Sequence, residues 1–212
     1  MKNVKIYKCF IASPSDTQEE RDICDKVFQE INKTQGELLG FRIESKKWEN
    51  DARPSFGKNS QDVINKQLLG DFQLFIGIMF KKFGTPTEKF NSGTEEEFYL
   101  AYDKYEEKAD VEIMFYFNDE PTNPHSIDLK QFYRVKEFRE LISDCGGLYW
   151  PYQGINNFED ELRRHLNQYF IDKEGTSQGK NDADGHILKN IEKLLKDRLN
   201  ESLSTFSNQP EV

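Results

Sequence analysis

Three adjacent glutamates follow a Ser-Gly-Thr turn in the stretch NSGTEEEFYLA, which spans residues 91–101. Their simplest role is to begin a helix, because Ser92 with Glu95, and Thr94 with Glu97, both fit the S/T-x-x-E capping box. Acidic side chains in a first turn also interact favourably with the helix dipole. The other role is catalytic, because a carboxylate beside a reacting centre can stabilise positive charge that develops there. The local spacing leaves both roles open.

The helix that this motif begins is expected to have an apolar stripe at Phe98, Ala101 and Tyr105. Glu97 lies beside that stripe, four residues before Ala101 on the same side of the helix. The two preceding glutamates are expected to point to water. Gly93 allows a substrate or another loop to approach the backbone closely. Glu97 is therefore the predicted catalytic residue, because it is best placed to face a crevice while it stays partly desolvated.

The elements that must position this residue follow from the hydrophobic pattern. Strands are predicted at residues 4–12, 41–48, 71–80, 111–117 and 147–152. Helices are predicted at residues 17–33, at 60–69, from the Ser-Gly-Thr motif onward, at 131–142 and at 158–170. This alternation predicts an α/β fold, a flavodoxin-like open parallel five-stranded sheet with helices on both faces. Ligands bind outside the carboxyl ends of such strands, so the functional side is expected at loops 13–17, 46–59, 81–94, 118–128 and 153–157.

The composition argues against several function classes. The 212 residues carry a net charge of -9, whereas a nucleic-acid surface should be basic. No stretch reaches the roughly 18 apolar residues of a membrane span, and the N-terminus lacks the features of a signal peptide. Cys9, Cys24 and Cys145 have no metal-like spacing. We therefore expect a cytoplasmic protein without metal or cofactor, and without direct contact with nucleic acid or membrane.

The chain is predicted to consist of a domain and a tail. Residues 1–171 form the α/β domain, residues 172–185 a flexible linker, and residues 186–206 an amphipathic C-terminal helix. The apolar stripe of that helix consists of Ile187, Leu188, Ile191, Leu194, Leu195, Leu199 and Leu203. A solvated helix does not need such a stripe. We therefore expect it to pack on the domain, on a second copy of the chain, or on a partner.

Several motifs resemble those of a TIR domain (Toll/interleukin-1 receptor type) over residues 4–170. VKIYKCFIASPSD resembles the first TIR strand with its loop, and WENDARPSFG resembles the long loop after the second strand. In enzymatic TIR domains the catalytic glutamate lies on the third helix and precedes an apolar residue, two further residues and an alanine. The segment from Glu97 to Ala101 matches that pattern. The combination ASPSD…SGTEEEF is more similar to an uncharacterised prokaryotic TIR-like family, often found at the front of multidomain NTPase proteins.

A second family resemblance converges on the same glutamate. Nucleoside 2-deoxyribosyltransferases carry Asp-Ser-Gly-Thr-x-x-Glu-x-Gly-x-Ala, with the glutamate as nucleophile, and the segment from Asn91 to Ala101 is similar in spacing. Asn91 replaces the aspartate of that family and Tyr99 replaces its glycine, which argues against base exchange. Both families cleave an N-glycosidic bond to a ribose with one glutamate.

The TIR resemblance implies that NAD⁺ is a substrate and not a cofactor. Ordinary glycoside hydrolysis uses two carboxylates, because the leaving group must be protonated. The nicotinamide of NAD⁺ leaves as a neutral molecule and needs no general acid. Positive charge develops on the ribose, and Glu97 could stabilise that charge or hold the ribose hydroxyls.

Residues in the first two loops are candidates for binding such a substrate. Ser13 and Ser15 could bind phosphate or ribose near a helix N-terminus, although Ser15 or Asp16 could instead cap the helix. Trp48 could stack on a base or belong to the core. Arg53 could pair with a pyrophosphate or remain solvated.

The third loop offers further binding candidates. In the stretch KKFGTPT, Phe83 and Gly84 could line a nicotinamide pocket. The two lysines before them could attract an anionic ligand or form a hydrated surface. Ser92 and Gly93 complete the predicted binding residues, at the turn before the glutamates.

Three functions are therefore expected in order of preference. The first is an NAD⁺-cleaving enzyme, either a hydrolase or a cyclase that makes a signalling nucleotide, since prokaryotic TIR-like domains often act as immune effectors when assembled. The second is a non-catalytic TIR-like adaptor that oligomerises. The third is a nucleoside deoxyribosyltransferase-like enzyme.

Overall fold

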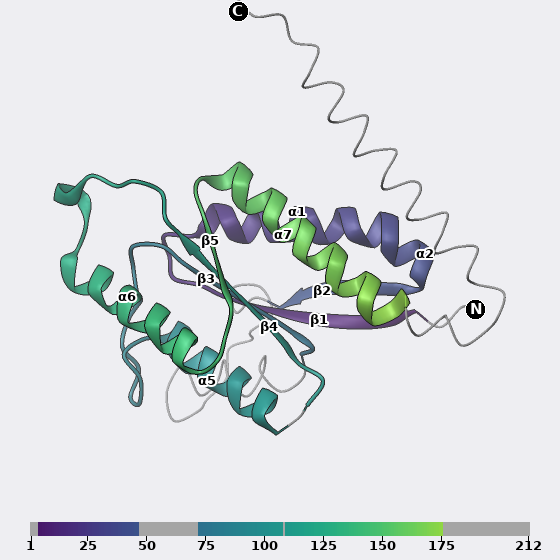
Figure 1. Ribbon diagram of the computed structural model, residues 1–212, viewed down its shortest axis with the longest axis horizontal. Coiled ribbons are helices and arrows are strands. Elements are labelled where there is room, and N and C mark those ends of the chain that lie inside the picture. Colours follow the sequence, from purple (N-terminus) through teal and green to yellow (C-terminus); the bar gives the residue numbers. More distant parts are fainter. Residues whose placement is uncertain (1–3, 47–71, 108, 176–212) are drawn as a thin grey trace, which may run out of the picture. The chain divides into compact units, whose positions relative to one another are not determined.

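A parallel β-sheet organises the part of the chain that the computed structural model describes, residues 4–46, 72–107 and 109–175 (Figure 1). All neighbouring strands of the five-stranded sheet are parallel. The strands are β1 (Lys5–Ala12), β2 (Phe41–Lys46), β3 (Leu74–Met79), β4 (Glu112–Asn118) and β5 (Tyr149–Tyr152). The predicted fold class, an α/β fold with an open parallel five-stranded sheet, is confirmed.

The strand order β2-β1-β3-β4-β5 creates one switch point in the sheet. The chain leaves β1 towards β2 on one side and later returns to place β3 on the other side of β1. Connections from β1 and β3 therefore run in opposite directions, which opens a crevice at their carboxyl ends. Ala12, the last residue of β1, pairs there with Gly77 of β3. The loops after β1 and β3 are consequently the expected walls of a ligand site.

Helices cover both faces of the sheet (Figure 1). The helices α1 (Gln18–Ile31) and α7 (Ile155–Phe170) lie on one face, and α5 (Gly93–Glu106) and α6 (Leu129–Asp144) lie on the other. Two salt bridges join the first pair, Lys26 to Glu159 at 2.9 Å and Arg163 to Glu30 at 3.1 Å. The shorter helical segments are η1 (Asn32–Gly36), α2 (Glu37–Leu39), η2 (Pro124–Ser126) and η3 (Ile171–Gly175).

Phenylalanine rings fill the core between the sheet and the pair α5 and α6. The Phe98 ring of α5 lies 6.0 Å from that of Phe115 in β4 and 5.4 Å from that of Phe138 in α6, both edge to face. Gly77 makes room for this packing, because a Cβ atom there would lie 2.2 Å from the Phe115 ring. Every residue of β3 is buried, which fits its prediction as a central strand covered on both faces.

The buried stripe of α5 is shorter than predicted. Phe98 and Ala101 are buried, but the side chain of Tyr105 is 54% exposed. Its ring stacks at 6.1 Å on the partly buried Tyr102 and does not enter the core. The prediction that Tyr105 belongs to the stripe is therefore wrong, because the last turn of α5 no longer faces the phenylalanine cluster.

Several predicted features lie outside the described residues. These are the helix at 60–69, Trp48, Arg53 and the C-terminal helix at 186–206. The π-helix η3 continues the helical backbone of α7 into the first residues of the predicted linker at 172–185, and Glu174 and Gly175 in it are buried. Among the helices that the structure describes, none is long and apolar enough to cross a membrane.

Candidate functional site

The first turn of α5 assigns distinct positions to the glutamates. Ser92 is the N-cap residue, with extended backbone, and its Oγ accepts a hydrogen bond from the Glu95 amide at 3.0 Å. The Glu95 carboxylate in turn accepts one from the Asn91 amide at 2.7 Å. Of the two possible capping boxes, the helix therefore uses Ser92 with Glu95, although the carboxylate accepts the amide before the N-cap and not that of Ser92 itself. The pair Thr94 and Glu97 is not the cap, so helix initiation does not account for Glu97.

Glu97 lies on the buried face of α5. Its side chain is 7% exposed, and it shares that face with the buried residues Thr94, Phe98 and Ala101. Glu95 and Glu96 are half-buried. Burying a carboxylate costs free energy unless other groups compensate its charge, so glutamate is seldom found this far inside a protein without a specific reason. The position of Glu97 beside the apolar stripe agrees with the prediction.

The loop between β3 and α5 is fixed to α6 by one side chain. The Gln131 Oε1 atom accepts hydrogen bonds from the backbone amides of Phe83, at 2.8 Å, and Gly84, at 3.0 Å. The Phe83 side chain is 2% exposed and its ring packs edge to face on Phe138 at 5.6 Å. Phe83 is thus part of the phenylalanine core, and only its outer side can line a pocket.

Two of the predicted binding residues, Gly84 and Ser92, lie against each other. Gly84 has a φ of +108°, and a Cβ atom built on it would lie 3.3 Å from the Ser92 Cβ. Glycine suits this position both because the backbone is left-handed and because the N-cap of α5 is so close. Ser92 is fully buried and Gly93, the first residue of α5, is half-buried. The turn before the glutamates is therefore closely packed.

The loop after β1 is held by a buried arginine. The Arg21 guanidinium of α1 donates to the Ser13 hydroxyl at 2.8 Å, to the Ser13 carbonyl at 3.2 Å and to the Pro14 carbonyl at 3.1 Å. Arg21 itself is 7% exposed. The Ser13 hydroxyl is therefore engaged in shaping the loop, whereas Ser15 is exposed and lies 3.4 Å from the Lys82 ammonium.

Asp16 links the two loops at the switch point. One of its carboxylate oxygens accepts hydrogen bonds from the backbone amides of Lys81 and Lys82, each at 3.0 Å. The expectation that Ser15 or Asp16 caps α1 is wrong: the N-cap is Thr17, which makes no side-chain capping bond. The reason is that the amides of the β3 loop compete for the Asp16 carboxylate and bind it.

A polar cluster on the α1 side of the sheet was not anticipated from the sequence. The Glu20 side chain is 6% exposed. It accepts hydrogen bonds from the Tyr152 hydroxyl at 2.8 Å and from the side-chain amide of Asn118 at 3.4 Å. Burial, and then the Glu20 charge, raise the pKa of Tyr152. A signal existed, because Glu20 stands four residues before Cys24 and seven before Val27, both on the buried face of α1. The bonds of Glu20 tie α1 to the ends of β4 and β5.

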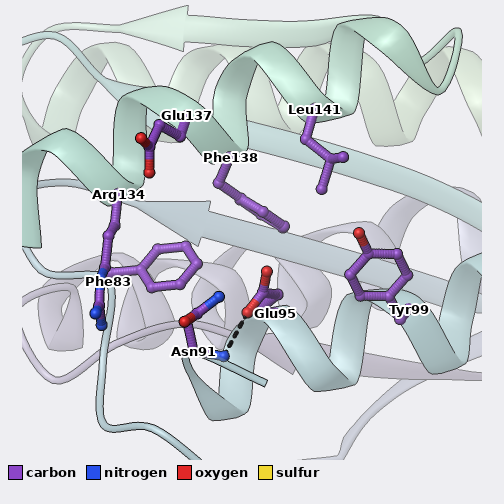
Figure 2. Close-up of a pocket in the computed structure, with 8 residues that line it drawn as sticks. All are labelled: Phe83, Asn91, Glu95, Tyr99, Arg134, Glu137, Phe138 and Leu141. Carbon is purple, nitrogen blue, oxygen red and sulfur yellow. Dashed lines mark hydrogen bonds between the residues drawn. The ribbon is translucent and has the colours of Figure 1, made fainter. Parts of the chain in front are cut away.

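A cavity of about 250 Å³ opens between the β3 loop, α5 and α6 (Figure 2). Phe83 lines it, but Glu97 does not. The predicted site residues are thus distributed over the carboxyl edge of the sheet: Ser15 with Lys82, Gly84 with Ser92, and Glu97 on the inner face of α5. Within the described ranges, no group of His, Cys, Asp and Glu side chains could hold a metal ion.

Comparison with known proteins places the chain in one family. No curated protein matches the sequence. Residues 8–167 match a family described as a domain of unknown function, DUF4062. The match begins within β1 and ends within α7, so it includes the other four described strands and the whole of α5. The chain belongs to the DUF4062 family.

Proposed function

We propose that this protein cleaves the bond between nicotinamide and ribose in NAD⁺, with Glu97 as the catalytic carboxylate. The observation that carries the proposal is the burial of Glu97 on α5, in the helix that follows the central strand β3. Because Ser92 and Glu95 form the cap of α5, capping does not by itself explain a glutamate at position 97. The resemblance of the segment from Glu97 to Ala101 to enzymatic TIR domains supports the same assignment.

The proposed reaction needs one carboxylate and no general acid. The bond between the ribose C1′ and the pyridinium nitrogen breaks, and its electron pair returns to the ring, which leaves as neutral nicotinamide. Positive charge develops on the ribose, and the Glu97 carboxylate stabilises it or holds the ribose hydroxyls. In hydrolysis, water then adds to C1′ and loses a proton to the solvent. In cyclisation, a nucleophilic atom of the same molecule takes the place of water.

The two loops at the switch point supply candidate groups for the rest of the substrate. The exposed Ser15 hydroxyl and the Lys82 ammonium, 3.4 Å apart, offer a donor and a positive charge for a pyrophosphate. Asp16 holds these loops together through the amides of Lys81 and Lys82. In this proposal Ser13 acts indirectly, because its hydroxyl is bonded to Arg21.

The test is NAD⁺ consumption by the purified protein, followed by chromatography of the products. We expect wild type to consume NAD⁺ at high protein concentration with a crowding agent. Glu97→Gln should consume NAD⁺ at least about 100-fold more slowly, a typical effect of removing one group that stabilises the transition state. Glu96→Gln, one residue away on the same helix, is the matched control and should retain activity. Thermal unfolding of all three proteins checks that the fold survives.

Three results would contradict this proposal. Unchanged NAD⁺ turnover in Glu97→Gln would remove Glu97 from the chemistry. No NAD⁺ loss by wild type at any concentration would favour a non-catalytic module. Exchange of the base of a deoxynucleoside in the same chromatographic assay would indicate a deoxyribosyltransferase instead. The product peak of an active protein separates a hydrolase from a cyclase.

A further inference from the structure

The cavity between α5 and α6 has an apolar base and a charged rim. Its base contains Phe83 and Phe138, each 2% exposed, and its rim carries three charged side chains (Figure 2). The complete lining is Phe83, Asn91, Glu95, Tyr99, Arg134, Glu137, Phe138 and Leu141. Groups of opposite charge thus surround an opening whose floor is aromatic.

The charged groups of the rim are available to a ligand. Arg134 and Glu137 are three residues apart on α6. In the part of the chain that the structure describes, their side chains make no hydrogen bond or ion pair, either with each other or with another residue. Glu95 uses one carboxylate oxygen to accept the Asn91 amide, which leaves the other oxygen for a further donor. The rim therefore offers one guanidinium and two carboxylates that do not neutralise one another.

The size of the cavity restricts its occupant. A volume of about 250 Å³ is below the roughly 300 Å³ at which sites for drug-sized ligands begin. A whole dinucleotide does not fit such a space. A small molecule with one apolar group, one positive charge and one negative charge matches both the volume and the lining.

We infer that this cavity binds a free α-amino acid with an aromatic or branched aliphatic side chain. The α-carboxylate would pair with the Arg134 guanidinium, whose geometry suits bidentate recognition of a carboxylate. The α-ammonium would bind the carboxylates of Glu137 and Glu95. The side chain would enter the base and pack on Phe83 and Phe138. This inference is independent of the proposed NAD⁺ chemistry, since Glu97 does not line the cavity.

An occupant of this cavity would contact the start of the helix that carries Glu97. Glu95 closes the first turn of α5 through its bond to the Asn91 amide, and both residues line the cavity. Tyr99 stands one turn further along the same helix, and burial, followed by the Glu95 charge, raises the pKa of its hydroxyl. The hydroxyl therefore stays protonated near neutral pH and is a hydrogen-bond donor at the end of the cavity away from Arg134 (Figure 2).

Isothermal titration calorimetry of the full chain tests the chemical class. The ligands are L-phenylalanine, L-leucine, phenethylamine, which lacks the carboxylate, and 3-phenylpropanoate, which lacks the ammonium. We expect at least one of the two amino acids to bind, and both half-molecules to bind about tenfold or more weakly, since each loses one charge-assisted contact. The inference is overturned if neither amino acid binds, or if a half-molecule binds as well as the amino acid.

Charge-removing variants on α6 test the assigned contacts. Arg134→Gln should weaken binding of the amino acid by about tenfold and leave the affinity for phenethylamine unchanged. Glu137→Gln should weaken binding of the amino acid and leave the affinity for 3-phenylpropanoate unchanged. Glu140→Gln, an exposed residue of the same helix that does not line the cavity, is the matched control. Wild-type affinity in both Arg134→Gln and Glu137→Gln would refute the inference. Since both residues lie at the rim, the variants should unfold at the wild-type temperature.

Discussion

At the scale of single residues, the start of α5 separates a structural glutamate from a buried one. The Ser92 hydroxyl accepts the Glu95 amide of the first turn, and the Glu95 carboxylate accepts the amide of Asn91, the residue before the N-cap. Glu97 lies two residues further on, on the opposite, inner side of the helix. A carboxylate that is buried and not needed for the cap is a better candidate for chemistry than one that is held in a cap.

The cap is expected to act on stability alone. Ser92→Ala removes the acceptor for the Glu95 amide and should lower the free energy of unfolding by about 1 kcal/mol. Urea denaturation measures this loss. Asn91→Ala is the control, because only the backbone amide of Asn91 takes part in the cap, and it should behave as wild type. Equal stability of Ser92→Ala and wild type would show that the bond does not support the helix.

At the scale of elements, the β3 loop is anchored from both sides. Asp16, in the loop after β1, binds the amides of Lys81 and Lys82, and Gln131, from α6, binds those of Phe83 and Gly84. Four consecutive amides are thereby satisfied by two side chains. A loop held in this way presents its residues in one conformation, which a binding site requires.

Removal of one anchor should loosen this loop without unfolding the sheet. Asp16→Ala leaves the Lys81 and Lys82 amides without their acceptor, so we expect a loss of about 1–3 kcal/mol in the free energy of unfolding. Amide hydrogen exchange should accelerate at those two positions and much less in β3. Asp22→Ala, which removes only a surface bond to Gln18, serves as the control. Unchanged exchange at both lysine amides would contradict the anchor.

At the scale of the whole molecule, ion pairs link α1 and α7 on one face of the sheet. Glu159 accepts from Lys26 of α1, and Arg163 binds Glu30. The hydrogen bond from Lys26 is the main cause that lowers the pKa of Glu159 below its ordinary value, against the opposing effect of burial. One partner of each pair is exposed, Lys26 at 61% and Glu30 at 46%, so each pair contributes little free energy.

The Glu159 pair makes a small part of the stability dependent on pH. Because folding lowers the pKa of Glu159, its contribution is complete above its ordinary value of 4.5 and disappears as the pH falls through the lowered value. Glu159→Gln should therefore cost about 0.2–1 kcal/mol at pH 7. That cost should vanish in strong acid. Urea denaturation at pH 7 and in strong acid, with Glu140→Gln as control, measures this cost. A cost that stays constant in acid would contradict the assignment.

Local patterns predicted the strands and most helix limits well. The nearly continuous apolar run at β3 indicated a strand buried on both faces, and all its residues are buried. The Ser-Gly-Thr motif indicated where α5 begins, and the helix starts at Gly93. Such signals are reliable because they express a period or a turn within one segment. The position of Glu97 beside the apolar stripe followed from the same helical spacing.

Contacts between distant segments could be decided only by the tertiary structure. The sequence fitted two capping boxes equally well. In the structure Ser92 caps the helix with Glu95, and Gly84 of the preceding loop packs against this Ser92. Asp16 was assigned to its own helix, yet its partners lie 65 and 66 residues away. The cavity takes its lining from a loop and two helices. Periodicity determines which face of an element is buried, whereas the partners of a polar side chain depend on which elements the fold brings together.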